Sequence, residues 1–191
     1  DRHENEEDVV YVTEMARCPG IRLIRLRGIK FMNYSMALGK LIHAGLEQYM
    51  SRLKDINFEV PVEKKVNCCG QEWRVKGRVD AIAVEDNREV ILEFKYVNSM
   101  KVLVKAPLPE HATQIKIYGY LTGITDGYLI YLNANLFTAI PIKLNMTDEE
   151  FMKLLRRTVE PPFNPPPPSV CETCVFRMYC PLRPGVFNVP E

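Results

Sequence analysis

The chain has 191 residues, 47% of them hydrophobic and 26% charged, and a formal net charge of +1. This length suits one domain with a small appendage, and the composition is that of an ordinary globular protein. No apolar run approaches the roughly 18 to 20 residues that cross a membrane, which excludes a membrane-spanning helix. The polar N-terminus has no apolar signal region, so we expect a cytoplasmic protein with no membrane partner.

Helical periodicity is the first structural signal along the chain. Residues 31–53 show it, and Ser35 is the expected N-cap. The apolar stripe of this helix contains Met36, Leu38, Leu41, Ile42, Leu46 and Tyr49. Strand-like runs follow at 58–66, 72–84 and 89–97, and the last two suit a hairpin.

Two further helices are indicated by their end signals. Pro109 lies near the start of the first and Gly123 just past its end. A strand pair at 127–133 and 137–144 separates it from the second, which opens with a capping box of Thr147 and Glu150. We therefore predict an α/β (α+β) fold in which helices flank a mixed central sheet.

A change in composition marks the predicted domain boundary. Residues 160–170 hold six of the fourteen prolines and are expected to form a stiff, extended connector. We predict a main domain over 1–160 and a unit over 161–191 that contains this connector and a cysteine knuckle. The knuckle is expected to pack back on the N-terminal region.

Three charged side chains interrupt the apolar hairpin at 72–97. In a strand, Glu93 and Lys95 point to the same side, and the hairpin can bring Asp80 beside Glu93. Two close carboxylates repel unless a positive charge lies between them, and hard oxygen ligands suit Mg²⁺ or Mn²⁺. With Lys95 beside the ion, the set could hydrolyse a phosphodiester. The alternative is three solvent-facing charges on a half-exposed hairpin.

Three side chains on the predicted helices could extend this site. His43 lies near the apolar stripe of the first helix and is either a metal ligand or a satisfied core histidine. Gln114 and Tyr118 lie four residues apart and share a face of the second helix, where they either serve the site or form a helix edge.

The cysteines supply a second candidate metal site. Cys171, Cys174 and Cys180 are spaced as Cys-x2-Cys-x5-Cys, which lacks a fourth ligand, and Cys18 is the obvious candidate for it. Thiolate sets select zinc or an iron–sulfur cluster. The adjacent Cys68 and Cys69 are interpreted as free thiols.

Taken in order, His43, "GRVD" ending at Asp80, "EFK" at Glu93 to Lys95 and "QIKIY" from Gln114 to Tyr118 resemble the motifs of RecB-like nucleases. These belong to the Asp/Glu-x-Lys restriction-endonuclease-like superfamily. The resemblance implies that His43, Asp80, Glu93 and the backbone carbonyl of Phe94 bind the metal. It makes Lys95 the catalytic lysine, and Gln114 and Tyr118 residues that position the site and the DNA.

The early cysteine and the three late ones resemble one branch, the CRISPR-associated exonuclease family called Cas-four. That resemblance implies a [4Fe-4S] cluster on Cys18, Cys171, Cys174 and Cys180 that ties the two ends of the nuclease domain together. It also implies exonuclease action on single-stranded DNA, 5′ to 3′, that trims spacer precursors in CRISPR adaptation. CRISPR integrase proteins would be partners, and a homo-oligomer is compatible with the motifs.

The expected DNA contacts and the rival functions complete the interpretation. A positive approach to the site is expected from Arg74, Lys76, Arg78 and Lys116, for each of which the alternative is a solvated surface. One rival is a non-catalytic or weakly active DNA-binding subunit of an adaptation or repair complex. Another is a zinc-stapled nuclease unrelated to CRISPR.

Overall fold

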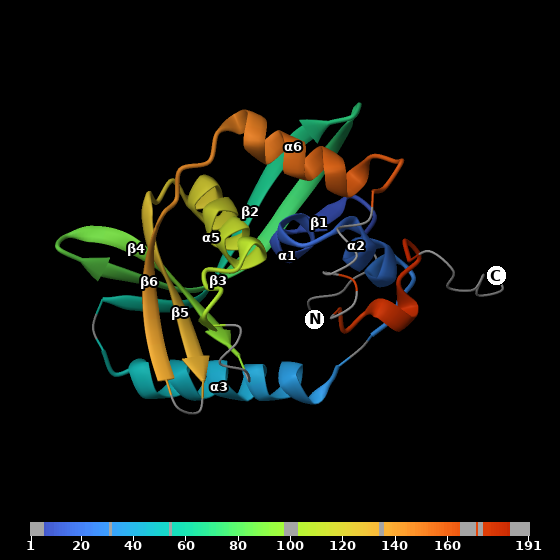
Figure 1. The fold of residues 1–191 in the computed structure, drawn as a ribbon. Coiled ribbons are helices and arrows are strands. Elements are labelled where there is room, and N and C mark those ends of the chain that lie inside the picture. The colour runs from blue at the N-terminus through green and yellow to red at the C-terminus, as the bar shows by residue number, and fades with distance from the viewer. Residues whose placement is uncertain are drawn as a thin grey trace.

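The computed structural model describes residues 6–30, 32–53, 55–97, 103–133, 136–164, 171 and 174–183 (Figure 1). The helices are α1 (Val12–Ala16), α2 (Pro19–Leu26), α3 (Tyr34–Met50), α5 (Pro109–Thr122) and α6 (Asp148–Val159), with a 3-10 turn η1 (Arg177–Tyr179). The strands are β1 (Val9–Tyr11), β2 (Ile56–Cys68), β3 (Gln71–Glu85), β4 (Arg88–Tyr96), β5 (Asp126–Asn133) and β6 (Leu136–Lys143). None of the helices among these described residues is long and apolar enough to cross a membrane.

The strands form one mixed six-stranded sheet, as predicted. Its order is β1-β3-β4-β5-β6, with β2 on the other edge of β3. The β1–β3 and β4–β5 pairs are parallel, and the remaining pairs are antiparallel. The predicted hairpin over β3 and β4 is present, with Ile82 opposite Ile91. The predicted fold class is therefore confirmed.

Strand β3 serves two neighbours on one edge. Its residues 74–76 pair with β1, and its residues 81–85 pair with β4. In the described part of the sheet, residues 77–80 have no strand partner on that edge, so β1 and β4 diverge there like the arms of a fork. Asp80 lies at the inner end of this fork.

Helices cover both faces of the sheet (Figure 1). The main core contains side chains of α1, α5 and α6, among them the fully buried Met15, Ile115 and Leu155. A smaller cluster around Phe94 packs against Leu46 of α3 on the other side. The sheet therefore lies between α3 and the α1, α5 and α6 group.

The apolar alternation of β3 does not keep its side chains in one core. The sequence predicts one apolar face for Trp73, Val75, Val79, Ala81 and Ala83, but Val75 and Val79 pack in the main core whereas Ala81 joins the smaller cluster. The change falls at Asp80. On β2, the facing residue Glu59 has a positive φ of 52°, a conformation rare for a residue with a side chain. Such irregular strand positions re-aim side chains beside active sites.

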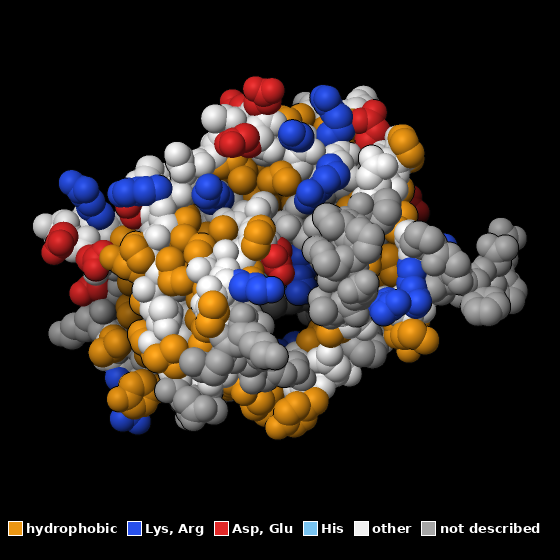
Figure 2. Space-filling view, viewed as in Figure 1, with side chains coloured by type: hydrophobic (Ala, Val, Ile, Leu, Met, Phe, Trp, Pro, Cys, Tyr) orange, Lys and Arg blue, Asp and Glu red, His pale blue; other side chains and the backbone are white. Residues whose placement is uncertain are grey.

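Helix α3 differs from its prediction at two points. Its N-cap is Asn33, not Ser35: the Asn33 side chain accepts a hydrogen bond from the N–H of Met36 at 2.9 Å. Its predicted apolar stripe is also only partly buried, because Leu41 and Tyr49 are 70% and 80% exposed. Hydrophobic side chains line the corresponding lower edge of the molecule in Figure 2. Only one side of α3 packs on the sheet, and that side carries His43, Leu46 and Met50.

The N-terminal segment is fixed by buried arginines. Arg25 is 7% exposed, and its Nε donates to Glu14 Oε1 at 2.7 Å. Arg22 is 5% exposed and lies over the Trp73 ring. Buried guanidinium groups paired in this way serve the fold, so these two arginines are not available to DNA. Of the predicted connector and knuckle, residues 165–170, 172–173 and 184–191 lie outside the described residues.

Candidate nuclease active site

Asp80 lies on β3 in the gap between β1 and β4, where groups from β4 and from α3 reach it. Asp80 Oδ2 accepts a hydrogen bond from the N–H of Phe94 on β4 at 2.9 Å. Asp80 Oδ1 lies 3.5 Å from Nδ1 of His43, which reaches the site from α3. The hydrogen bond from the Phe94 N–H fixes the carboxylate, and its other oxygen faces the imidazole.

His43 also faces the main chain of β4. Its Nε2 lies 3.1 Å from the carbonyl oxygen of Phe94. This is the distance of an ordinary N–H···O=C hydrogen bond, which would make Nε2 the donor and leave Nδ1, the ring nitrogen that faces Asp80, for a metal ion. The ligand roles of His43 and of the Phe94 carbonyl, implied by the resemblance, stay predictions.

Glu93 is the buried acid of the site. Its side chain is 1% exposed, and its Oε1 accepts from Lys95 Nζ at 2.6 Å and from Gln114 Nε2 at 2.8 Å. Its Oε2 is buried without a hydrogen-bond partner. Burial, followed by the charge of Asp80, raises the pKa of Glu93 to about 8, although Lys95 opposes the shift. An unsatisfied buried oxygen beside a second carboxylate is an environment that a cation would stabilise.

Lys95 and Gln114 form a network with this acid. Lys95 Nζ also donates to Gln114 Oε1 at 3.0 Å, so the amide is held from both ends. Gln114 is presented by α5, which has Pro109 in its first turn and ends at Gly123 with a φ of 80°. The predicted end signals thus fix the helix that brings Gln114 over β4.

Sequence reasoning missed one carboxylate of the site, Glu59. Among the described residues, His43, Glu59 and Asp80 offer ligand atoms that all lie within 4.8 Å of one another. Glu93 is outside this tight group, although Glu59 contributes to the raised pKa of Glu93 after the larger effects of burial, Asp80 and Lys95. Glu59 belongs to no sequence motif, and its position depends on the β2–β3 register. The one available signal was that Glu59 has apolar residues on either side of it in the sequence.

Tyr118 and His111 lie near the site, the first buried and the second half-buried. Tyr118 is 2% exposed and packs in the main core, and a Cβ added to Gly77 would lie 2.6 Å from its ring. This placement favours support of the sheet over contact with DNA. The His111 Nδ1 lies 3.0 Å from the Tyr131 hydroxyl. Burial, and then the nearby Lys95, lowers the pKa of His111 to about 3, so this imidazole is neutral at physiological pH.

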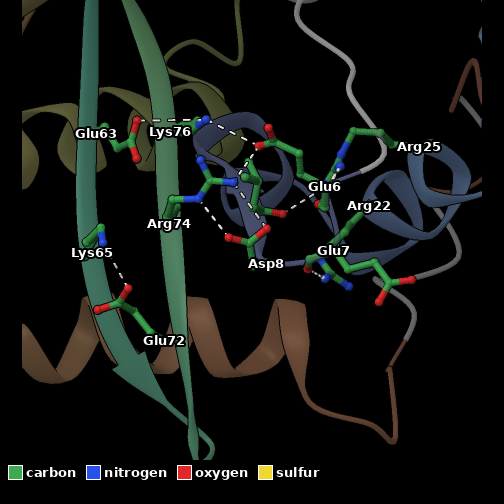
Figure 3. Close-up of polar contacts among 11 residues, drawn as sticks. Glu6, Glu7, Asp8, Arg22, Arg25, Glu63, Lys65, Glu72, Arg74 and Lys76 are labelled. Carbon is green, nitrogen blue, oxygen red and sulfur yellow. Dashed lines mark hydrogen bonds and ion pairs between the residues drawn. The ribbon is translucent and has the colours of Figure 1, made fainter.

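Three of the four side chains expected to contact DNA form ion pairs with acidic residues. Arg74 pairs with Asp8 and Glu6, each at 2.8 Å, and Lys76 lies 3.4 Å from Glu6 (Figure 3). Arg78 pairs with Glu59. Lys116 on α5 is half-buried. On the face shown in Figure 2, basic side chains are interspersed with acidic and hydrophobic ones and do not form one continuous basic patch. Contact of these four residues with DNA stays a prediction.

The four cysteines of the second predicted site lie near one another. Cys18 is the N-cap residue of α2, and a Cβ added to Gly20 would lie 3.5 Å from Cys18 Sγ and 2.9 Å from Cys180 Sγ. Burial raises the pKa of Cys18, and the nearby Cys180 and Cys174 act in the same direction. Burial likewise raises the pKa of Cys171, with Cys180 and Cys174 adding to the shift. A glycine cradle between thiols that come from both ends of the chain fits a metal centre.

The remaining two cysteines lie elsewhere. Cys68 is buried and Cys69 exposed, and their sulfur atoms are 3.2 Å apart. Neither forms a disulfide bond, and their interpretation as free thiols without a metal stays a prediction.

The geometry of the first site suits one kind of chemistry. Carboxylate and carbonyl oxygens with an imidazole form a hard ligand set for Mg²⁺ or Mn²⁺, and an adjacent ammonium group can meet an anionic phosphate. A mixed sheet that presents an Asp and a Glu-x-Lys pair in this way is the arrangement that the resemblance to RecB-like nucleases predicts.

The comparisons with known proteins point to the same class. No protein-family model matches the chain. The chain is 29% identical over 193 residues to the CRISPR-associated exonuclease Cas4 of Saccharolobus solfataricus, covering 95% of this chain and 91% of that protein. The crystal structure of SSO0001 is similar with a TM-score of 0.80 and 27% identity, over 94% of this chain and 88% of the other. An alkaline exonuclease from Laribacter hongkongensis, with a TM-score of 0.54, 16% identity and coverage of 78% and 82%, shares the fold.

The chain is therefore a relative of CRISPR-associated exonuclease Cas4 and has the fold of RecB-like nucleases. The resemblance predicted from the motifs is confirmed, and with it the predicted enzyme class of a nuclease.

Proposed function

We propose that this chain is a metal-dependent deoxyribonuclease that hydrolyses single-stranded DNA at the site around Phe94. The observation that carries the proposal is the buried Glu93, which shares Oε1 between Lys95 and Gln114 and keeps Oε2 without a partner. Asp80 accepts a hydrogen bond from the Phe94 N–H, and His43 faces the Phe94 carbonyl. A buried oxygen without a partner calls for an explanation, and beside a second carboxylate a cation that binds there supplies one.

In this proposal, His43, Asp80, Glu93 and the Phe94 carbonyl hold a Mg²⁺ or Mn²⁺ ion. When bound, such an ion lowers the pKa of a water molecule and neutralises charge on the scissile phosphate. Lys95 has three N–H donors, of which Glu93 and Gln114 take two. The third donates to the attacking water or to a phosphate oxygen, and Gln114 keeps the ammonium group in that orientation.

The cysteine set extends the proposal to a [4Fe-4S] cluster held by Cys18, Cys171, Cys174 and Cys180. Its support is the proximity of the thiols and their close approach to Gly20, where a side chain would collide with Cys180 Sγ. Such a cluster supplies a covalent link between the two ends of the chain. The unit over 161–191 would then be an appendage fixed to the 1–160 domain through α2.

The biological role follows from the relationship to the CRISPR-associated exonuclease. In the cytoplasm, the chain would trim spacer precursors from their 5′ ends during CRISPR adaptation, with the CRISPR integrase proteins as partners. Self-association into a homo-oligomer is compatible with this role.

The test uses cluster-containing protein, Mn²⁺ and single-stranded DNA labelled at either end. We expect the wild type to degrade the DNA, and the label released first gives the polarity. Lys95→Ala and Glu93→Gln should lose at least about 100-fold in rate, because proton transfer and charge stabilisation contribute that much each. Lys143→Ala and Glu89→Gln change exposed residues of β6 and β4 and serve as matched controls.

Equal cleavage by wild type and the Lys95 and Glu93 variants would show that the site is not catalytic. A wild type that binds DNA but leaves it intact would instead support the rival function, a DNA-binding subunit.

A further inference from the structure

Glu59 occupies an unusual place opposite Asp80. Phe58 pairs with Ala81 and Val60 with Val79, so Glu59 and Asp80 face one another between these two rungs. The positive φ of Glu59 breaks the regular strand geometry there. One of its carboxylate oxygens lies within 4.8 Å of ligand atoms of His43 and Asp80.

A second, independent feature of the site is a buried oxygen without a partner. Glu93 Oε2 is buried without a hydrogen-bond partner. Glu93 lies outside the group formed by His43, Glu59 and Asp80, but it is the buried acid of the same site, and its unsatisfied oxygen is a separate sign that the site lacks a cation. Two close carboxylates such as those of Glu59 and Asp80 either share a cation, or one of them takes up a proton.

Arg78 supplies one such cation. Its Nε forms an ion pair with Glu59 Oε2, and the two side chains are 42% and 26% exposed. Arg78 lies two residues before Asp80 on β3, within the described stretch 77–80 that pairs with neither β1 nor β4. A partly exposed pair of this kind is weak and can exchange partners at little cost.

We propose that Glu59 is a further ligand of the divalent metal and exchanges Arg78 for the ion when the metal binds. The inference rests on the proposed function, because it uses the same metal site. In the metal-free protein Arg78 neutralises Glu59. Once the metal takes the Glu59 carboxylate, the Arg78 guanidinium is free, and its planar fork of donors suits a DNA phosphate. Metal loading and DNA binding are thereby coupled through one arginine.

The first test measures Mn²⁺ binding by titration calorimetry, without DNA. Asp80→Asn reports on the proposed metal site itself, and we expect it to abolish binding. Glu59→Gln keeps the size of the side chain but removes its charge, and we expect about tenfold weaker binding or more. Glu63→Gln changes an exposed carboxylate of the same strand and should bind Mn²⁺ like the wild type.

These variants separate the two ideas. If Asp80→Asn abolishes binding and Glu59→Gln does not weaken it, the metal site stands and the role of Glu59 is overturned. If Asp80→Asn binds like the wild type, the metal site is wrong, and the inference falls with it.

The second test examines the exchange. Arg78→Ala removes the competitor for Glu59, so Mn²⁺ should bind a few-fold more tightly in the wild-type background. In the Glu59→Gln background the same change should have no effect, because the competition acts through Glu59. Equal gains in both backgrounds would mean that Arg78 acts only through its general charge, which overturns the exchange. Glu59→Ala, which also removes the carboxylate, serves as the second background should Glu59→Gln fail to fold.

The third test measures single-stranded DNA binding by fluorescence anisotropy in a metal chelator. Glu59→Gln should bind DNA more tightly than the wild type, since its Arg78 is released without metal. Glu63→Gln removes the same charge but should gain less. Equal gains in the two variants would overturn the release of Arg78.

Discussion

At the scale of single residues, Glu93 shows how one carboxylate serves two purposes. Its Oε1 is committed to Lys95 and Gln114, which fixes its orientation, and its Oε2 faces a buried region without a partner. The contacts with Lys95 favour the ionised acid, but burial and the nearby Asp80 outweigh them and raise its pKa to about 8. At neutral pH, the folded metal-free protein therefore holds a proton on Glu93 that the unfolded chain has lost.

This raised pKa predicts a pH-dependent stability. Between the ordinary carboxyl pKa of 4.5 and about 8, the native state binds more protons than the unfolded state, so the free energy of unfolding falls as the pH rises. Glu93→Gln mimics the protonated acid and cannot ionise. We expect this variant to become more stable than the wild type, by several kcal/mol, as the pH rises from 5 to 8. Denaturant unfolding of both metal-free proteins measures the difference.

Two controls sharpen this measurement. Glu89→Gln, an exposed change on the same strand, should follow the wild type at every pH. Added Mn²⁺ should stabilise the wild type at pH 8 far more than Glu93→Gln, because the ion requires the ionised carboxylate. Parallel stability profiles for wild type and Glu93→Gln would contradict the raised pKa.

The residues of the site were predictable to different degrees. The proximity of Asp80 and Glu93 depends only on strand alternation and on a short hairpin, both of which are local. Glu59 was not predictable, because its position requires the register of a long hairpin and a backbone conformation that no sequence rule assigns to glutamate.

At the scale of elements, the meeting of β3 with α5 and α1 depends on a missing side chain. A Cβ on Gly77 would lie 2.6 Å from the Tyr118 ring and 2.8 Å from Val12 Cγ2. The glycine thus allows both helices to approach β3 three residues before Asp80. Tyr118 is then a packing partner of β3, which explains a tyrosine at this point of the "QIKIY" motif.

A pair of glycine substitutions tests this packing. Gly77→Ala should lower the free energy of unfolding by about 1–3 kcal/mol, the usual cost of overpacking a core. Gly45→Ala in α3 meets no heavy atom within 4 Å and should raise it by about 0.5–1 kcal/mol, because alanine is the better helix former. Thermal melts compare the two. A Gly77→Ala protein as stable as the wild type would show that Tyr118 is free to move aside.

The elements, like the residues of the site, were predictable to different degrees. The boundaries of α5 and α6 were predicted from Pro109, Gly123 and a capping box because those signals act within a few residues. The parallel pairing of the three-residue β1 with β3 was not predicted, since so short a strand has no recognisable period and its partner is distant in sequence. The exposure of Leu41 and Tyr49 on α3 likewise depends on which side of the helix the sheet covers.

At the scale of the whole molecule, the described C-terminal residues 174–183 lie beside α2 (Figure 1). Cys18 and Cys180 both approach Gly20, although Cys18 precedes the three other cysteines by roughly 150 residues. The missing fourth ligand made Cys18 the candidate partner of the late cysteines, and the resemblance to the CRISPR-associated exonuclease family implied that a cluster ties them together, which stays a prediction. By loop-closure entropy, a covalent link across such a span stabilises a fold by on the order of 4–5 kcal/mol.

The proposed cluster therefore predicts a loss of stability as well as of iron. Cys180→Ser should lose iron and acid-labile sulfide, and its melting temperature should fall by 10 °C or more, at about 2–4 °C per kcal/mol for a chain of this size. The double change Cys68→Ser and Cys69→Ser should keep both the iron and the melting temperature. Stoichiometric zinc in the wild type would favour the zinc-stapled alternative.

Gly20→Ala distinguishes a shaped cradle from four thiols that are merely close. This variant keeps every cysteine, but its new methyl group would lie 2.9 Å from Cys180 Sγ, closer than a carbon and a sulfur atom can approach. If the cluster occupies the space between Cys18 and Cys180, Gly20→Ala should lose most of its iron, as Cys180→Ser does. If Gly20→Ala retains full iron and sulfide, the sulfur atoms have room to rearrange, and the cluster does not depend on the close approach of α2 to the C-terminal cysteines.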